Sequence, residues 1–557
     1  MPFAKLLRTV LLPLGLSLGT VLGLGCFFET NDDQHLAWLF RGLTAAEPVR
    51  AVPLYFHGLG YLLSQLYAAV PALPWYGLLL AALLALATVL VFAVLDRLLR
   101  PHLRSPALVL TLTVFFLLAW LEHWLWFSHL RVALLLAGAA VLFAAQRPGR
   151  RGVLGCCLLM LLAWAIRPSA AVLALLAAAP GAVLLAGSWR QARPVLLGAA
   201  AALGAATLAL SLTQSPATAR FRAIDSSLAA VVDYDLRRPS PRTPADSLLV
   251  QAVDEWMLGD STLVSEAGSR RAYVFDIGRY LTRVLPAKLG SRLPLLLRDY
   301  FAVLLLIALL GWGASRRQPL RQPVRGLQLG WVCLLLSLAT VLKLPPRLAL
   351  PLLDCWLLAN LAACLPAAEN LHRAAGHPGS SILLPGRQLR LLLVGVALLC
   401  LLYGAKTWHR HQMLRQERSR HEQALADIAR RSSRHIRVLA GADDLLKSLS
   451  PFQNYSLGPG PVLWLTGWPS HDPSQARLYY RLTGYSGQAD ALRVLATRQH
   501  ADVVWILTHQ PARWLQRRLN ARLPGEPPAA RPAVALEPGL ILKADTTLRL
   551  YNIRWVR

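Results

Sequence analysis

The stretch Glu29–Arg50, ETNDDQHLAWLFRGLTAAEPVR, directly follows the first apolar segment of the chain, Leu6–Phe28. It therefore begins at a membrane surface. Carboxylates at such a position are costly unless a cation, a metal or a substrate uses them. We interpret Asp32 and Asp33 as the reactive centre of a membrane enzyme, with Glu29 as a further candidate. The alternative is a solvated loop in which Asp32 or Asp33 is the N-cap of the helix containing LAWLF.

Composition places the chain among helical membrane proteins. Of its 557 residues, 55% are hydrophobic, and many apolar runs approach the roughly 20 residues that cross a bilayer. The formal charge of +29 comes mostly from Arg residues in short loops between apolar runs, which is the positive-inside pattern. Membrane lipids are therefore expected partners, and nucleic acid is not. The seven Cys residues lie in apolar segments and show no metal-binding spacing.

The basic loops orient the predicted spans. We take Leu6–Phe28 as a retained helix whose amino end is cytoplasmic. Val52–Val70 shows helical spacing of apolar residues, and we place it along the surface as a juxtamembrane helix. If it crossed the bilayer, the basic clusters at 97–104 and 147–151 would both lie outside, against the positive-inside rule. The remaining apolar runs, counted with this parity, predict about eleven spans.

Two domains are expected. Residues 1–406 are the transmembrane domain, which includes a first outer loop at 29–74 and a long outer loop at 214–299. Residues 407–557 are expected to form a small extracytoplasmic α/β domain. The fold class is thus mainly α, a polytopic α-helical membrane protein with an α/β domain at its carboxyl end.

The pattern after residue 407 predicts a partly parallel sheet. Short apolar runs at 435–440, 462–466 and 503–507 are separated by helix-like stretches. Residues 541–556 partly alternate and predict a closing hairpin. No phosphate-binding loop or nucleophile motif is evident in this domain, so we interpret it as a lid or a docking module.

The layout of the whole chain resembles that of the GT-C-type membrane glycosyltransferases. One span precedes an acidic loop with juxtamembrane helices, and many spans then lead to a soluble extracytoplasmic domain. The likeness in motif is confined to ETNDD in the first loop, and PLYFHGLGYLL after it is loosely similar. The resemblance implies a polyprenyl-phosphate-linked sugar as donor and a catalytic Asp or Glu in the first outer loop, here Asp32 or Asp33. The chain departs from the family in showing no sharp family motif in its carboxyl-terminal domain.

Such a transferase needs a carboxylate that deprotonates or orients the acceptor hydroxyl, and cations that stabilise the phosphate. No cofactor is certain, and a divalent ion, Mg²⁺ or Mn²⁺, is an open alternative because paired acids can hold one. Basic residues near outer helix ends are the candidate phosphate partners. These are Lys343, Arg347, Arg167, Arg50 and His57. The alternative for each cation is contact with lipid headgroups.

Glu122 and His123, in LAWLEHWLWF, lie near the outer end of a predicted span. Ionisable residues at membrane depth are candidate functional residues. The alternative is that Glu122 pairs with an Arg of a neighbouring helix and that the flanking Trp residues form an interfacial belt.

The sequence thus predicts a glycosyltransferase of the cytoplasmic (inner) membrane. It would move a sugar from a polyprenyl-phosphate donor to a glycan, lipid or protein acceptor of the envelope, on the outer face. A transporter or flippase of a lipid-linked substrate is one alternative, although we find no convincing inverted repeat. The other alternative is a non-catalytic scaffold for envelope assembly, which would tolerate neutralisation of Asp32 and Asp33.

Overall fold

The computed structural model divides the chain into two compact units, which we call the helical unit and the mixed unit. The helical unit comprises Met1–Phe27, Gly77–Leu212 and Lys288–Leu414, and the mixed unit comprises Phe28–Tyr76, Thr213–Ala287 and Arg415–Arg557. The structure describes residues 2–147, 149–316, 321–365, 386–432, 435–497, 502–521, 533–542 and 545–556.

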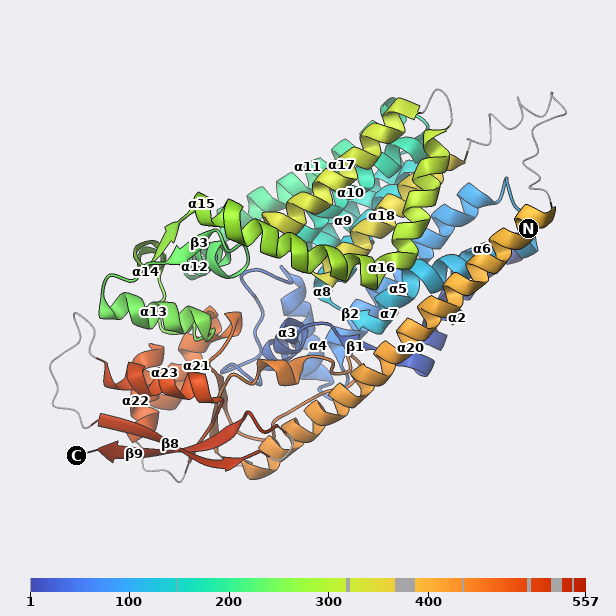
Figure 1. Ribbon diagram of the computed structural model, residues 1–557. Helices are drawn as coiled ribbons and strands as arrows, with labels where there is room; N and C mark the ends of the chain where they lie inside the picture. The colour runs from blue at the N-terminus through green and yellow to red at the C-terminus, as the bar shows by residue number, and fades with distance from the viewer. Residues whose placement is uncertain are drawn as a thin grey trace. The chain divides into compact units, whose positions relative to one another are not determined.

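Helices dominate the helical unit (Figure 1). Among the described residues, eight helices are long and apolar enough to cross a membrane, so the architecture is that of a helical membrane protein. The helices assigned mainly to this unit are α1 (Pro2–Leu6), α2 (Leu12–Leu24), α5 (Trp75–Leu99), α6 (Ser105–Phe115), α7 (Leu121–Leu125), α8 (His129–Ala145), α9 (Arg150–Ile166), α10 (Pro168–Ala186), α11 (Trp189–Thr213), α16 (Leu285–Ser315), α17 (Arg321–Thr340), α18 (Pro346–Cys364) and α20 (Gly386–Arg431).

The expected count of about eleven spans is not confirmed. Eight of the predicted stretches coincide with the long apolar helices. The other three are helical, and α8 and α9 have 17 residues each, which is at the short end of the range that crosses a bilayer. The last predicted span, near residues 391–406, is part of α20, which continues for 46 residues.

Helices and short strands from three distant segments build the mixed unit. Its helices are α3 (Asn31–Arg41), α4 (Leu59–Ala69), α12 (Pro216–Val232), α13 (Pro244–Asp254), α14 (Glu266–Ala272), α15 (Ile277–Arg279), α21 (Pro473–Thr483), α22 (Gln488–Thr497) and α23 (His509–Asn520). The short strands β3 (Arg237–Pro239) and β4 (Tyr273–Phe275) pair in antiparallel fashion. The predicted juxtamembrane helix corresponds to α4, which begins at Leu59 instead of Val52 and has 11 residues.

A five-stranded sheet of order β6-β5-β7-β9-β8 forms the carboxyl-terminal part of the mixed unit. Its strands are β5 (Ile436–Ala440), β6 (Val462–Trp464), β7 (Val503–Leu507), β8 (Ala533–Ile541) and β9 (Arg549–Val556). The expected partly parallel sheet is present, since β5 is parallel to β6 and β7, and β9 is antiparallel to β7 and β8.

The predicted start of the closing hairpin is wrong. Its first strand begins at Ala533, and Ile541 is the last residue of that strand. The register shifts between Pro538 and Ile541, because a proline removes a ladder donor and a bulge interrupts the alternation.

One hydrophobic core joins the segment 214–299 to the sheet. Leu249, Met257 and Leu263 from the loop belong to the same buried cluster as Val438 and Trp505 from the sheet. Burial of large apolar side chains contributes roughly 1.5–3 kcal/mol each. The loop is therefore held in the mixed unit by packing as well as by hydrogen bonds.

Candidate functional site

The acids of ETNDD lie at the beginning of α3. Thr30 is the N-cap, with extended backbone, and Asp32 and Asp33 lie in the first turn. The alternative role in which Asp32 or Asp33 is itself the N-cap is therefore wrong. Carboxylates in a first turn are still favoured, because the helix dipole is positive there.

Asp33 is fully buried, with 0% of its surface exposed. The Tyr76 hydroxyl donates to its Oδ1 over 2.7 Å, and the Thr30 hydroxyl donates to its Oδ2 over 3.1 Å. The ring of Phe56 packs against Tyr76, with 5.3 Å between their centroids. Both carboxylate oxygens thus have protein donors in an aromatic setting, and Asp33 acts as an anchor for the first turn of α3.

Asp32 differs from its neighbour because it is only partly buried. The indole Nε1 of Trp468 donates to its Oδ1 over 2.9 Å. Within the residues that the structure describes, no other side chain or backbone group donates to Asp32. One oxygen is therefore fixed by the protein, and the other accepts no hydrogen bond from the described residues.

Asp443, which the sequence-based prediction missed, accepts hydrogen bonds beside the start of α3. Its Oδ1 lies 3.4 Å from Asn31 Nδ2, 3.2 Å from His35 Nε2 and 3.1 Å from Trp464 Nε1, and its Oδ2 accepts the Thr466 hydroxyl. Burial alone would raise the pKa of Asp443, but the hydrogen bonds and the charge of His35 hold that pKa below its ordinary value.

Asp443 carried a signal in the sequence. It follows the buried strand β5 by three residues, and the carboxyl ends of parallel strands are common positions for functional side chains. Its partners on α3 are more than 400 residues away, at separations of 408 and 412. A local sequence pattern therefore could not predict that Asp443 contacts the acidic loop.

Aromatic contacts hold α3 along its length. His35 and Trp464 meet edge to face with 5.0 Å between ring centroids, and Trp38 lies 5.7 Å from Trp464 in the same way. Trp38 Nε1 donates to the Tyr455 carbonyl over 3.0 Å, and Arg41 donates to the same oxygen over 2.8 Å. The first-loop helix and the carboxyl-terminal segment thus form one packed structure.

The predicted phosphate-binding residues are divided between the two units. Arg50 and His57 belong to the mixed unit, as do Asp32 and Glu29, whereas Arg167, Lys343 and Arg347 belong to the helical unit. Arg50 is exposed, and its guanidinium lies 5.8 Å from the centre of the Tyr61 ring. Arg167 is the residue immediately before α10, and Lys343 and Arg347 flank the start of α18.

Glu122 and His123 form separate buried networks inside the helical unit. Lys406 Nζ lies 2.7 Å from Glu122 Oε1, and Arg410 lies 3.1 Å from its Oε2. The ion pair offered as an alternative role for Glu122 is therefore present, with α20 as the partner helix. His123 Nε2 lies 2.6 Å from Asp354 Oδ2, with both side chains buried.

The carboxylates around Asp32 are largely engaged in protein hydrogen bonds. Both oxygens of Asp33 and both of Asp443 already accept protein hydrogen bonds. Only one oxygen of Asp32 is left among these acids. Across the described part of the chain, no group of three or more His, Cys, Asp or Glu side chains is placed to hold a metal.

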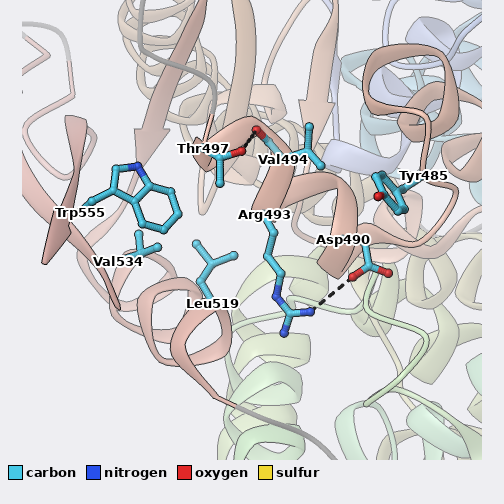
Figure 2. A pocket seen from close by; sticks show the side chains of 8 residues that line it. All are labelled: Tyr485, Asp490, Arg493, Val494, Thr497, Leu519, Val534 and Trp555. Carbon is cyan, nitrogen blue, oxygen red and sulfur yellow. Dashed lines mark hydrogen bonds and ion pairs between the residues drawn. The ribbon is translucent and has the colours of Figure 1, made fainter. Parts of the chain in front are cut away.

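A hollow of about 340 Å³ lies elsewhere in the mixed unit (Figure 2). Trp555 and Val534 lie at one end, Asp490 and Tyr485 at the other, and Arg493 lies between them. Asp490 and Arg493 form an ion pair of 3.3 Å. The hollow borders β8 and β9, at the opposite edge of the sheet from β6, and none of the predicted site residues lines it.

Comparisons of the chain with protein-family models, curated proteins and solved structures found no match.

Proposed function

We propose that the chain is a GT-C-like membrane glycosyltransferase that moves a sugar from a polyprenyl-phosphate donor to an envelope acceptor. The acceptor is a glycan, a lipid or a protein. In this proposal the protein resides in the inner membrane with about eleven spans and a cytoplasmic amino end. The carboxyl-terminal domain is extracytoplasmic, and transfer occurs on the outer face.

The geometry of Asp32 is the observation that carries the proposal. A general base must hold its carboxylate within hydrogen-bond reach of the proton that it accepts. Asp32 has one oxygen fixed by Trp468 over 2.9 Å and one oxygen open. Asp33 is buried with donors on both oxygens, so we assign the base to Asp32 and a positioning role to Asp33.

The proposed step is a displacement at the anomeric carbon of the donor. The open oxygen of Asp32 takes the proton of the acceptor hydroxyl as that hydroxyl oxygen bonds to the anomeric carbon. The bond from the anomeric carbon to the phosphate oxygen breaks, and the polyprenyl phosphate leaves with the electron pair. Cations stabilise the negative charge on the leaving phosphate. Arg50 and His57, which belong to the same unit as Asp32, are the candidates for that role.

A transporter or flippase of a lipid-linked substrate is the second candidate function, because the helical unit buries ionisable groups. Charged side chains within membrane-spanning bundles commonly mark ion or substrate pathways. The pair His123–Asp354 is buried, with 2.6 Å between its atoms. A transporter of this kind would not depend on the open carboxylate of Asp32.

Complementation of a deletion strain tests the proposal. Wild type is compared with Asp32→Asn, Asp33→Asn and the matched control Glu47→Gln, which neutralises an exposed acid of the same loop. We expect Asp32→Asn to insert normally while an envelope glycan loses a sugar and its lipid-linked donor accumulates. If Asp32→Asn supports wild-type glycans at wild-type expression, the transferase proposal is refuted.

A further inference from the structure

We propose that Trp468, in the carboxyl-terminal domain, is a positioning residue that orients Asp32 for proton transfer. This inference rests on the proposed function. It gives the carboxyl-terminal domain a part in the catalytic centre, beyond a role as a lid or docking module.

The hydrogen bond between Trp468 and Asp32 has a fixed direction. An indole Nε1–H can only donate, and it lies 2.9 Å from Asp32 Oδ1. Trp468 is 9% exposed, and its ring meets Tyr55 edge to face with 5.3 Å between centroids. A buried donor therefore holds one oxygen of a partly exposed carboxylate, which sets the direction of the other oxygen.

The two residues before Trp468 are themselves held in place by hydrogen bonds. Thr466 donates its hydroxyl to Asp443, and the Gly467 backbone N–H donates to the Trp256 carbonyl over 2.8 Å. Gly467 has φ 74° and ψ −179°, a region that is essentially restricted to glycine. A donor held in this way fixes the orientation of the carboxylate that accepts from it, so the second oxygen of Asp32 keeps one direction.

The acceptor of Trp468 distinguishes it from Trp38 and Trp514, two other buried indoles of the mixed unit. Trp38 and Trp514 donate to the backbone carbonyls of Tyr455 and Leu248, each over 3.0 Å. Those bonds fasten one chain segment to another. Trp468 instead donates to a side chain that we assign to the chemistry. Trp514→Phe is thus a matched control, since it removes an indole bond from the same domain without touching Asp32.

The bond can be tested without reference to any activity. Full-length protein labelled with ¹⁵N on its indole nitrogens, in detergent micelles, gives one N–H resonance for each Trp. Trp468→Phe identifies the Trp468 resonance by its loss, and Trp514→Phe identifies that of Trp514. Replacing Asp32 with Asn should move the Trp468 resonance upfield, because a neutral acceptor makes a weaker hydrogen bond than a carboxylate. The Trp514 resonance should stay in place. If the chemical shift of the Trp468 resonance is unchanged in Asp32→Asn, the inference is overturned.

The catalytic consequence is measured with the lipid-linked sugar fraction extracted from the deletion strain as donor and the envelope of that strain as acceptor. Loss of one hydrogen bond predicts a roughly fivefold fall in kcat for Trp468→Phe with KM unchanged. Rates are normalised to folded protein, and Trp514→Phe should change neither constant. Equal falls in the two variants, or no fall in either, overturn the positioning role. If Asp32→Asn transfers sugar normally, the proposed function itself fails, whereas the resonance shift still reports the bond.

Discussion

Asp32 and Asp33 are adjacent, yet their replacement by Asn should have opposite effects. We expect Asp33→Asn to destabilise α3 and Asp32→Asn to leave α3 nearly intact while sugar transfer is lost. The two substitutions remove the same charge from the same helical turn, so the helix dipole contributes alike to both. The difference comes from burial and hydrogen bonding, because Asp33 is 0% exposed and Asp32 is partly exposed.

The magnitude follows from the donors of each carboxylate. Asp33 accepts two side-chain hydrogen bonds, at 2.7 and 3.1 Å. Hydrogen bonds to a charged group contribute about 1.5–3 kcal/mol each, against about 0.5–1.5 for neutral pairs. In Asp33→Asn the amide oxygen can accept one of these bonds as a neutral one, and the amide nitrogen that replaces the other oxygen cannot accept the second. The expected loss is roughly 2 kcal/mol. Asp32 accepts one bond, which an Asn oxygen can keep, so its loss should stay below about 1 kcal/mol.

Hydrogen–deuterium exchange of the peptide that covers Asn31–Arg41 measures these losses locally. A loss of about 2 kcal/mol corresponds to roughly 30-fold faster exchange through opening of α3. Glu47→Gln serves as the control in the same loop, since Glu47 pairs with Arg477 at an exposed site. Wild-type exchange in Asp33→Asn together with fast exchange in Asp32→Asn would refute the assignment of the anchor to Asp33 and of the open base to Asp32.

Three further predictions concern the mixed unit. The pKa of Asp443 is depressed in the folded state, so its stabilising contribution is present above the ordinary pKa of 3.8 and is lost as the pH falls through the lower folded pKa. The temperature of the thermal unfolding midpoint should therefore decrease when the pH is lowered below about 4, and Asp443→Asn should weaken this pH dependence. Asp260 and Arg518 form a buried ion pair with 2.5 Å between their atoms. Asp260→Asn should lower the free energy of unfolding by about 3–5 kcal/mol, and replacement of both residues by hydrophobic ones should restore it, as measured by chemical denaturation. Gly467→Ala should lower the stability of the fold by about 1–3 kcal/mol, because the φ and ψ angles of Gly467 are strained for any other residue. Thermal unfolding of this variant is compared with that of Gly484→Ala, which changes a glycine at an ordinary helix end.

Apolar periodicity and strand signals predicted much of the architecture. The runs at 435–440, 462–466 and 503–507 correspond to β5, β6 and β7, because short apolar runs between helices are typical of parallel strands. Helix α16 is kinked at Tyr300, where φ is −123° and ψ is 24°. This residue directly follows the predicted loop 214–299, so the kink lies where the sequence predicts that a span begins. The predicted first residue of the hairpin was wrong because Pro538 and Gly539 interrupt the alternation of apolar and polar residues within β8, and the prediction depended on that alternation.

The contacts that complete the candidate site could not be predicted in the same way. Trp468 and Asp32 are separated by 436 residues, and no local spacing relates an indole to a carboxylate over that distance. The burial of Asp33 is likewise tertiary, since its Tyr76 donor lies 43 residues later. Sequence patterns report which face of an element is apolar, whereas these contacts depend on which elements meet.

The choice between a catalytic and a structural role for the acidic loop has a physical basis in α3 itself. Successive residues of an α-helix point about 100° apart, so two adjacent carboxylates cannot occupy the same environment. Asp33 turns into the aromatic core, where it must be satisfied on both oxygens, and Asp32 turns toward the boundary of that core. A buried anchor beside an open carboxylate restricts the motion of the open one, since the backbone of the first turn is held by its neighbour. Both roles are therefore expected together, and the exchange and transfer measurements on Asp32→Asn and Asp33→Asn separate them residue by residue.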